Sequence, residues 1–429
     1  MGEAVITSDR TMHDMNMRMM DRLVQKLVLG QLNRLQVGRL HMIDKDQRWT
    51  FGHGGGDLEA TVKVNDKRFY QALVFSGTVG VADAYIDGLW HSDNLTDVFR
   101  ILVQNNTVMN GLSKGWARLA AKGQEWLHEL HRNTRLGSHR NIAAHYDLGN
   151  NFYRLWLDDT MMYSCAIYDE QHQTLDDAAR NKVDRICQKL DLQPGDHLLE
   201  IGTGWGGFAV YAAKHYGCRV TTTTISKEQY ALAIERVKEE GLEDRVTVLL
   251  KDYRDLDGQY DKLVSIEMIE AVGHQYYNMF FKVCSDLLKP DGLMLLQAIT
   301  ISDWAYERAK HTVDFIKSHI FPGSCIPSVA AISNSVARVT NLRPVHLEDI
   351  GPHYVRTLYD WRTRFVAQLD AVRAQGFDDR FIRMWEYYLC YCEAGFAERY
   401  ISDIQLLMAK PQNRRAPIVP REIGRISVV

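Results

Sequence analysis

The stretch "LLEIGTGWGGFAVYAA", residues 198–213, decides the expected fold of this chain. Its first half is a short apolar run of the length of a buried strand, and its second half is expected to be a helix. Glycines stand between the two halves at Gly202, Gly204, Gly206 and Gly207. Because glycine lets the backbone approach a ligand closely, a strand that turns into a helix through such a loop predicts a nucleotide-type binding site.

The residues after this stretch continue to alternate between short apolar strands and helices. Strands are expected at 219–226, 245–256, 260–272 and 293–300, and helices at 227–242 and 277–292. This alternation indicates βαβ units around a parallel sheet. Right-handed crossovers would then give a doubly wound, Rossmann-like α/β fold.

The glycine loop is not expected to hold a phosphate group. No Lys or Arg lies in it, Glu200 stands just before it, and the second strand ends in "TTTTIS". That ending lacks the acidic residue that usually holds a ribose in dinucleotide-binding folds. A carboxylate beside the loop repels phosphate and suits a cationic ligand. S-adenosylmethionine, which carries a sulfonium and an ammonium group, is therefore the predicted cofactor, and another kind of open α/β enzyme is the alternative.

Two residues after the third strand are candidates for contact with an adenine ring. "KDYRD", residues 251–255, places Asp252 and Tyr253 at that strand end. The carboxylate of Asp252 would accept from the adenine amino group, and the ring of Tyr253 would stack beside it. The alternative for Asp252 is an ordinary helix N-cap.

Charge and composition limit the classes of function. The net charge is −3, from 51 basic against 54 acidic residues, which gives no general attraction to nucleic acid. No apolar run approaches the length that crosses a bilayer, and the first residues lack an apolar signal core, so a cytoplasmic location is expected. The seven cysteines are scattered, which favours reduced structural cysteines over a disulfide framework or a metal site.

The N-terminal third differs in pattern from the α/β part. Residues 15–37 carry apolar residues at roughly helical spacing, and "FGHGGGDLEATVKV" is a glycine turn followed by strand-like alternation. The stretch 106–140 is polar and basic. These patterns predict a smaller N-terminal mixed α/β domain with a linker over residues 1–135 and an α/β domain over 136–429, for which the resemblance described next implies catalysis and helical lipid-binding insertions.

Several long motifs, in one order, resemble the cyclopropane-fatty-acyl-phospholipid synthases and the related mycolic acid cyclopropane synthases. The resemblance runs from about Ala144 to Met408, and a weaker match to the extra N-terminal domain of the phospholipid-acting members rests on "YIDGLW". The motifs are "AHYDLGNNFYRLWLDDTMMYSCAIY", "LLEIGTGWGGFAVYAA", "TTTISKEQ", "SIEMIEAVG", "FIKSHIFPGSCIPS", "HYVRTLYDWRTRF" and "YYLCYCEAGFAERYI".

The resemblance implies a class I S-adenosylmethionine-dependent methyltransferase that acts on the cis double bond of a lipid acyl chain and forms a cyclopropane. A carbocation would develop on the chain, so the site must align the reactants, exclude water and stabilise positive charge. The residues implied to contact the cofactor are Tyr163, Ser164, Glu200, Gly202, Gly204, Thr224, Gln229, Asp252 and Tyr253.

In the family, the base that removes a proton from the new methyl group is thought to be a bound bicarbonate. By resemblance, Cys165 and Ile299 would offer backbone N–H groups to this anion, Tyr354 its hydroxyl, and Glu270 would anchor or orient it. The Cys165 thiol need not react, because its sequence neighbours supply no His or cation to form a thiolate. The alternatives are a helix-surface carboxylate for Glu270 and a core position for Tyr354.

The sequence departs from the family at Gln297, where a histidine is usual two residues before the isoleucine. Glutamine can donate a hydrogen bond to an anion, but it cannot become cationic or transfer a proton. Ring formation is still the expected outcome. A methyl-branched or methylene lipid is the alternative product if deprotonation takes another course.

The expected partner is a membrane phospholipid with unsaturated acyl chains, reached from the inner face of the membrane by peripheral association. Candidate membrane contacts are residues 15–37, the basic stretch 114–140 and the arginine-containing tail. A homodimer is also considered. Two other functions stay open, namely a small-molecule N-methyltransferase and a non-catalytic lipid-binding protein built on a decayed enzyme.

Overall fold

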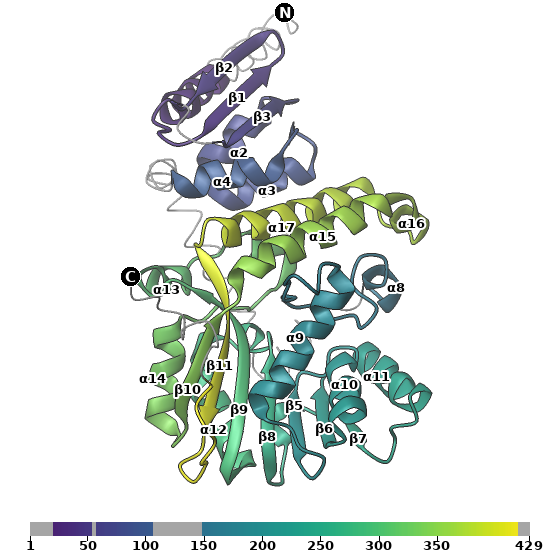
Figure 1. Ribbon diagram of the computed structural model, residues 1–429. Coiled ribbons are helices and arrows are strands. Elements are labelled where there is room, and N and C mark those ends of the chain that lie inside the picture. The colour runs from purple at the N-terminus through teal and green to yellow at the C-terminus, as the bar shows by residue number, and fades with distance from the viewer. Residues whose placement is uncertain (1–19, 54–56, 106–147, 419–429) are drawn as a thin grey trace, which may run out of the picture. The chain divides into compact units, whose positions relative to one another are not determined.

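The computed structural model describes residues 20–53, 57–105 and 148–418, and the chain forms two compact units (Figure 1). The first unit contains residues 1–130, 312–320 and 369–398, and the second contains 131–311, 321–368 and 399–429. The sequence-based boundary at residue 135 lies outside the described residues. That division assigned the segments 312–320 and 369–398 to the catalytic part, whereas here they belong to the first unit.

Within its described residues, the second unit contains a seven-stranded sheet in the order β10-β11-β9-β8-β5-β6-β7. Neighbouring strands from β9 to β7 are parallel, and β11 and β10 add to β9 as an antiparallel pair. The strands are β5 (His197–Ile201), β6 (Arg219–Thr224), β7 (Val246–Leu250), β8 (Tyr260–Ile266), β9 (Leu288–Ile301), β10 (Arg343–Asp349) and β11 (Ile401–Ala409).

Side chains of β5 alternate between two hydrophobic cores, one on each face of this sheet. Leu198 packs in a core with Phe208 of α10 (Gly207–Tyr216), and Leu199 packs in a second core with Phe280 of α12 (Tyr277–Leu287). Because strand side chains point alternately to opposite faces, a continuous apolar strand is buried on both sides. The sheet is therefore covered by helices on both faces, as the sequence pattern predicts.

The other helices of this unit flank the sheet or extend from its ends. They are α8 (Asn150–Tyr153), α9 (Leu175–Leu190), α11 (Lys227–Glu239), α13 (Asp303–Ala309), α14 (Val329–Val339) and α15 (Gly351–Ala367), with short turns η1 (Tyr253–Asp255), η2 (Ile269–Ala271) and η3 (His274–Tyr276). Residues of α9 and α11 share the core of Leu198, and residues of α14 share that of Leu199.

The order of the strands fixes where a ligand site is expected. β5 lies between β6 and β8, so the chain leaves β5 toward one side of the sheet and later returns to its other side. Open α/β sheets bind ligands beyond the carboxyl ends of the strands at such a switch point. The carboxyl ends of β5 and β8 carry the glycine loop and "EMIEAVG", respectively.

The first unit has a four-stranded sheet within its described residues, in the order β2-β1-β3-β4, with helices beside it. Tyr387 of α17 packs against the rings of Tyr85, Phe99 and Phe315, at centroid distances of 5.6, 4.8 and 4.6 Å. The core of this unit is therefore completed by residues from much later in the chain. Its elements are β1 (Arg39–Asp44), β2 (Gln47–Phe51), β3 (Glu59–Val64), β4 (Trp90–Ser92), α2 (Arg68–Phe75), α3 (Gly77–Ile86), α4 (Leu95–Gln104), η4 (Ile316–Ile320), α16 (Leu369–Ala374) and α17 (Asp379–Ala397).

The helix predicted at 15–37 is observed over residues 20–32 of the described chain. Val24 and Val28 are buried, while Met20, Leu23 and Leu27 are more than half exposed. The candidate contact at 114–140 lies outside the described residues, and so does the tail (410–429) from residue 419 onward. In the described part of the tail, the guanidinium of Arg415 donates to the carbonyl of Gln188 at 2.9 Å. In the described ranges, no helix combines the length and apolar character required to cross a membrane.

Candidate active site

The glycine loop after β5 has a backbone conformation that requires glycine. Gly202 has φ +102° and Gly206 has φ +86°. A Cβ on Gly202 would lie 3.3 Å from Met268, and a Cβ on Gly206 would lie 3.1 Å from Ala233 of α11. Positive φ and close neighbours together exclude larger residues. The loop therefore lies directly against the segment that follows β8.

Glu200 lies buried under this loop and fixes it to β6. Its Oε2 accepts a hydrogen bond of 2.5 Å from the hydroxyl of Thr222, which in turn shares a hydrogen bond with Thr203 in the loop. Burial raises the pKa of Glu200 to about 8. Glu200 thus positions the loop, and its contact with a cofactor stays a prediction.

The raised pKa of Glu200 predicts a pH-dependent stability. The folded protein holds this proton between about pH 5 and 8, where the unfolded chain has lost it, so stability falls as pH rises. In the ligand-free protein, Glu200→Gln is expected to flatten this fall by up to about 1.4 kcal/mol per pH unit. Urea unfolding of both proteins at several pH values measures the two slopes, and equal slopes would contradict the assignment.

The other predicted cofactor residues lie at the carboxyl ends of β6 and β7. The hydroxyl of Thr224 donates to Oε1 of Gln229 at 2.8 Å. Asp252 accepts from the backbone N–H of Arg254 at 2.9 Å and also pairs with its guanidinium at 2.6 Å, so the N-cap that was the alternative is present. Tyr253 packs edge-on against Phe280. An adenine contact by either residue stays a prediction.

The loop that carries Tyr163, Ser164 and Cys165 is held at its start by the carboxylate of Asp158. Asp158 accepts from the backbone N–H groups of Thr160 at 2.8 Å and Met162 at 3.0 Å. These contacts hold the turn at Met161, which has a positive φ of 55°.

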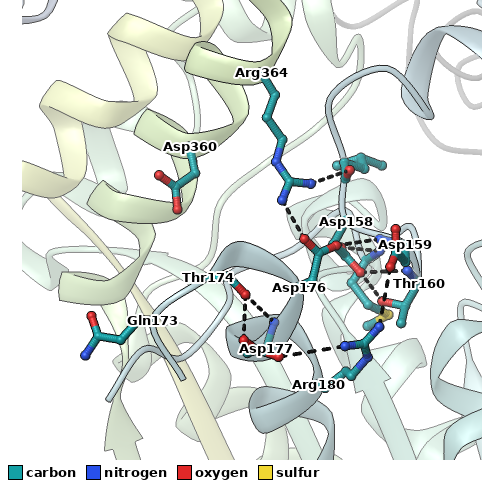
Figure 2. Close-up of polar contacts among 12 residues, drawn as sticks. Asp158, Asp159, Thr160, Gln173, Thr174, Asp176, Asp177, Arg180, Asp360 and Arg364 are labelled. Carbon is teal, nitrogen blue, oxygen red and sulfur yellow. Dashed lines mark hydrogen bonds and ion pairs between the residues drawn. The ribbon is translucent and has the colours of Figure 1, made fainter. Parts of the chain in front are cut away.

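Two arginines attach this turn to the neighbouring helices. Arg364 of α15 pairs with Asp176 of α9 at 2.5 Å and donates to the carbonyl of Leu157 at 3.0 Å (Figure 2). Arg236 of α11 donates to the carbonyls of Thr160 at 2.7 Å and Trp205 at 3.3 Å. The turn and the glycine loop are therefore held together by one guanidinium.

A carboxylate that the sequence analysis did not single out, Glu267, lies at the centre of the site. Its Oε1 accepts from the backbone N–H of Cys165 and from the side-chain amide of Gln297, both at 2.8 Å. Its Oε2 accepts from the hydroxyl of Tyr354 at 2.7 Å. Cys165 and Tyr354, which the resemblance assigned to a bound bicarbonate, therefore converge with Gln297 on a side chain of the protein itself.

The antiparallel strand β11 adds two further polar side chains behind Gln297. The amide nitrogen of Gln297 also donates to Asp403 at 3.0 Å, and its oxygen accepts from Gln405 at 3.0 Å. Burial, followed by the charge of Glu267 and a hydrogen bond to it, raises the pKa of Asp403 well above its ordinary value. The neutral form of Asp403 is therefore favoured more than that of an ordinary aspartate.

Glu270 lies three residues after Glu267 but has a different environment. Its Oε1 accepts from the backbone N–H of Ile299 at 2.5 Å, whereas its buried Oε2 has no hydrogen-bond partner among the described residues. Burial and, next, the charge of Glu267 raise the pKa of Glu270 to about 8. The alternative of a solvated surface carboxylate is therefore wrong.

A buried cation balances this group of carboxyls. Lys182 of α9 is fully buried and donates to the hydroxyl of Ser164 at 2.6 Å. Burial lowers the pKa of Lys182, while the charges of Glu267, Asp158 and others oppose this shift. Burial also raises the pKa of the Cys165 thiol well above its ordinary value, so this thiol is no nucleophile and its contribution is the backbone N–H.

Aromatic rings lie next to the carboxyl cluster. The ring of Trp361 is 5.3 Å from Tyr163, 5.6 Å from Trp156 and 5.9 Å from Tyr354, centroid to centroid. Because Tyr354 also donates to Glu267, this aromatic cluster is continuous with the carboxylate. Across the ranges that the structure describes, no group of three or more His, Cys, Asp or Glu side chains is arranged to hold a metal ion.

The structure therefore brings Cys165, Gln297 and Tyr354 together on one acceptor and Ile299 onto another. Sequence reasoning missed the acceptor Glu267, although it lies three residues before Glu270 in a motif that had been quoted. The sequence around Asp403 did not indicate a functional site, because only the pairing of β11 with β9 places this residue beside Gln297.

Comparison with known proteins finds a matching family and relatives that are lipid methyltransferases or cyclopropane synthases. Residues 133–406 match the family described as mycolic acid cyclopropane synthetase. A tuberculostearic acid methyltransferase of Mycobacterium tuberculosis is 39% identical, covering 77% of this chain and 78% of its own. A cyclopropane-fatty-acyl-phospholipid synthase of Escherichia coli is 38% identical, covering 82% and 87%. The solved structure of a mycolic acid cyclopropane synthase complexed with SAH and CTAB has a TM-score of 0.59 at 32% identity, covering 63% of this chain and 98% of the other.

Proposed function

Since the chain belongs to the mycolic acid cyclopropane synthetase family and is an S-adenosylmethionine-dependent methyltransferase, we propose that it modifies an unsaturated phospholipid. The proposed reaction adds a methyl group to the cis double bond of an acyl chain and closes a cyclopropane ring. An alkene is a weak nucleophile, so positive charge develops on the acyl chain before the ring closes. The site must stabilise that charge and then remove a proton.

The continuity between the aromatic cluster and Glu267 carries this proposal. Faces of Tyr163 and Trp361 offer the negative potential that stabilises a nearby cation. Tyr354 connects these rings to a carboxylate that can accept a proton. The buried rings of Trp156, Tyr354 and Trp361 would also help to exclude the water that would trap a carbocation.

The described residues fit S-adenosylmethionine at the glycine loop. Residues 198–207 contain no Lys or Arg, and Gly202 keeps the backbone close to Met268 with space for no side chain. Gly202, Gly204, Thr224, Gln229, Asp252 and Tyr253 would hold the cofactor from the strand ends, with Tyr163 and Ser164 from the loop before α9. When bound, this cofactor supplies an electrophilic methyl group to the alkene.

A bound bicarbonate does not fit the arrangement of these side chains. Cys165, Gln297 and Tyr354 already donate to Glu267. A further anion would lie beside two other carboxyls, Glu270 and Asp403, whose pKa values are already raised by burial and, next, by the charge of Glu267. No step of the proposed reaction is therefore assigned to bicarbonate.

A methyl-branched or methylene lipid is the second candidate product. Two observations favour it: Gln297 stands where the family usually has histidine, and a relative at 39% identity is a tuberculostearic acid methyltransferase. Both products share the methyl transfer and differ only in how the cation is resolved. In a methylene lipid, a hydride shift first brings the positive charge onto the methyl-bearing carbon, and the methyl group then loses its proton; a saturated methyl branch would need a separate reduction of the resulting double bond.

Peripheral binding to a membrane surface is also proposed, because the acyl chain of a phospholipid must leave a bilayer to be modified. The helix over residues 20–32 supports this proposal. It exposes Met20, Leu23 and Leu27, which lie at the helical spacing of one face.

Offering the purified enzyme three acceptors tests the substrate class. The acceptors are vesicles of a monounsaturated phospholipid, the free monounsaturated fatty acid, and a secondary amine, each with methyl-labelled S-adenosylmethionine. We expect label in the acyl chains of the vesicles. Label in the amine with none in either lipid would contradict the proposal and favour a small-molecule N-methyltransferase.

A further inference from the structure

We infer that the carboxylate of Glu267 takes the place of an external anion and is the base that removes the proton during ring closure. This inference rests on the proposed function, because it assigns the second step of that reaction. It also accounts for Gln297 in the position where the family usually has histidine.

The donors around Glu267 form a complete anion site. One backbone N–H, one side-chain amide and one phenol donate to its two oxygens at 2.7–2.8 Å. These distances are those of hydrogen bonds to a charged acceptor. Three converging donors favour a carboxylate over a carboxylic acid, because a protonated oxygen would face another donor.

The backbone at Glu267 shows that this placement is imposed by the surrounding structure. The backbone of Glu267 has φ +47°, a left-handed conformation that residues other than glycine adopt at a cost of roughly 1–2 kcal/mol. The backbone N–H of Glu267 donates to the carbonyl of Gln297 at 2.9 Å, which holds the residue at the end of β8. Strained residues of this kind concentrate at functional sites.

Asp403 and Lys182 lie close enough to interact with the carboxylate of Glu267. The amide nitrogen of Gln297 donates to both Asp403 and Glu267, and burial together with the charge of Glu267 raises the pKa of Asp403, so that negative charge on both carboxyls at once is disfavoured. The ammonium of Lys182, buried in the same region, interacts favourably with Glu267. Gln297 contacts both carboxyls through one amide nitrogen and therefore fixes their separation.

The neighbouring carboxyl, Glu270, is less suited to the same step. It is bound to the backbone at Ile299, and burial favours its neutral form near pH 7. Glu267 is instead joined through Tyr354 to the rings that would surround the cation. Glu270 is therefore assigned to tuning the charge of Glu267, and Glu267 to the proton transfer.

The assigned step balances without any additional reagent. A C–H bond of the newly added methyl group breaks, and its proton moves to an oxygen of Glu267. The electron pair of that bond forms the third carbon–carbon bond of the ring and neutralises the cation on the chain. The proton is then released to solvent, so that Glu267 is ionised again for the next turnover.

The test compares turnover on unsaturated phospholipid vesicles in buffer freed of carbon dioxide with turnover in buffer containing bicarbonate. The wild-type enzyme is expected to work equally well in both. Glu267→Gln keeps the size of the side chain and removes the base, so ring formation should fall by about 10²–10⁴-fold in both buffers. Glu267→Gly relieves the positive φ and opens the anion site, and bicarbonate is expected to restore part of its activity.

Cofactor titration of each variant shows that it is folded. A wild-type enzyme that loses its activity without bicarbonate would overturn the inference and leave the proposed function intact. So would a Glu267→Gln variant with wild-type turnover. Absence of labelled lipid from the wild-type enzyme in both buffers would instead refute the proposed function, and the inference with it.

Discussion

Replacing Glu270 with Gln is expected to lower turnover by about 10²–10³-fold while the affinity for S-adenosylmethionine changes by less than about twofold. The charge of Glu267 is one cause of the raised pKa of Glu270. When Glu267 accepts a proton, that charge disappears and Glu270 becomes easier to ionise. Glu270 can then lose its own proton and keep one negative charge in the carboxyl cluster as Glu267 becomes neutral, which an amide cannot do.

The measurement combines saturating turnover with calorimetric titration of the cofactor. Glu235→Gln, the same change at an exposed position of α11, is the matched control and should leave both quantities unchanged. Parallel loss of cofactor affinity and turnover in Glu270→Gln would place Glu270 in the cofactor site. Unchanged turnover in Glu270→Gln would show that Glu270 takes no part in the reaction.

Gly202→Ala is expected to weaken cofactor binding by at least about tenfold and to lower the free energy of unfolding by roughly 1–3 kcal/mol. The added Cβ would lie at φ +102° and 3.3 Å from both Cβ and Cγ of Met268. Either the loop or the segment of Met268 must shift. Since Glu267 precedes Met268, such a shift would also disturb the carboxylate.

Gly195→Ala is the matched control for this substitution. Gly195 lies just before β5, has no positive φ, and has no neighbouring atom within 4 Å of an added Cβ. Cofactor titration and urea unfolding of both variants measure the difference. Wild-type affinity in Gly202→Ala would show that the cofactor does not depend on the close approach at this loop.

The sequence predicted the α/β fold well because its signals are local. The strand, glycine loop and helix at 198–213 follow directly from apolar spacing and glycine positions, and the structure confirms them as β5 and α10. The membership of α17 in the first unit was not predictable in the same way. It depends on ring contacts of Tyr387 with residues about 300 positions earlier, which no local pattern encodes.

The sequence pointed to several donors of the candidate site but not to their acceptor. Cys165, Ile299 and Tyr354 were assigned to one anion by resemblance, and Gln297 was expected to donate to it. Cys165, Gln297 and Tyr354 share the acceptor Glu267, whereas the backbone N–H of Ile299 donates to Glu270. The acceptor Glu267 was overlooked because the resemblance supplied an anion from outside the chain, so no second carboxylate was sought.

Two polar contacts also escaped the sequence analysis for geometric reasons. Asp403 reaches Gln297 only through the antiparallel register of β11 with β9. The pairing of Asp252 with Arg254 depends on a short helical turn that brings the guanidinium back onto the carboxylate. Neither follows from spacing alone.

Mass spectrometry of acyl chains tests the central claim most directly. The protein is expressed in a host without its own synthase, the cells receive methyl-deuterated methionine, and their lipids are compared with those of an empty-vector control. The account predicts acyl chains that gain one methylene unit with two deuterium atoms and lose the double bond, as ring closure requires. Labelled chains that retain a double bond, or no labelled chains at all, would contradict it.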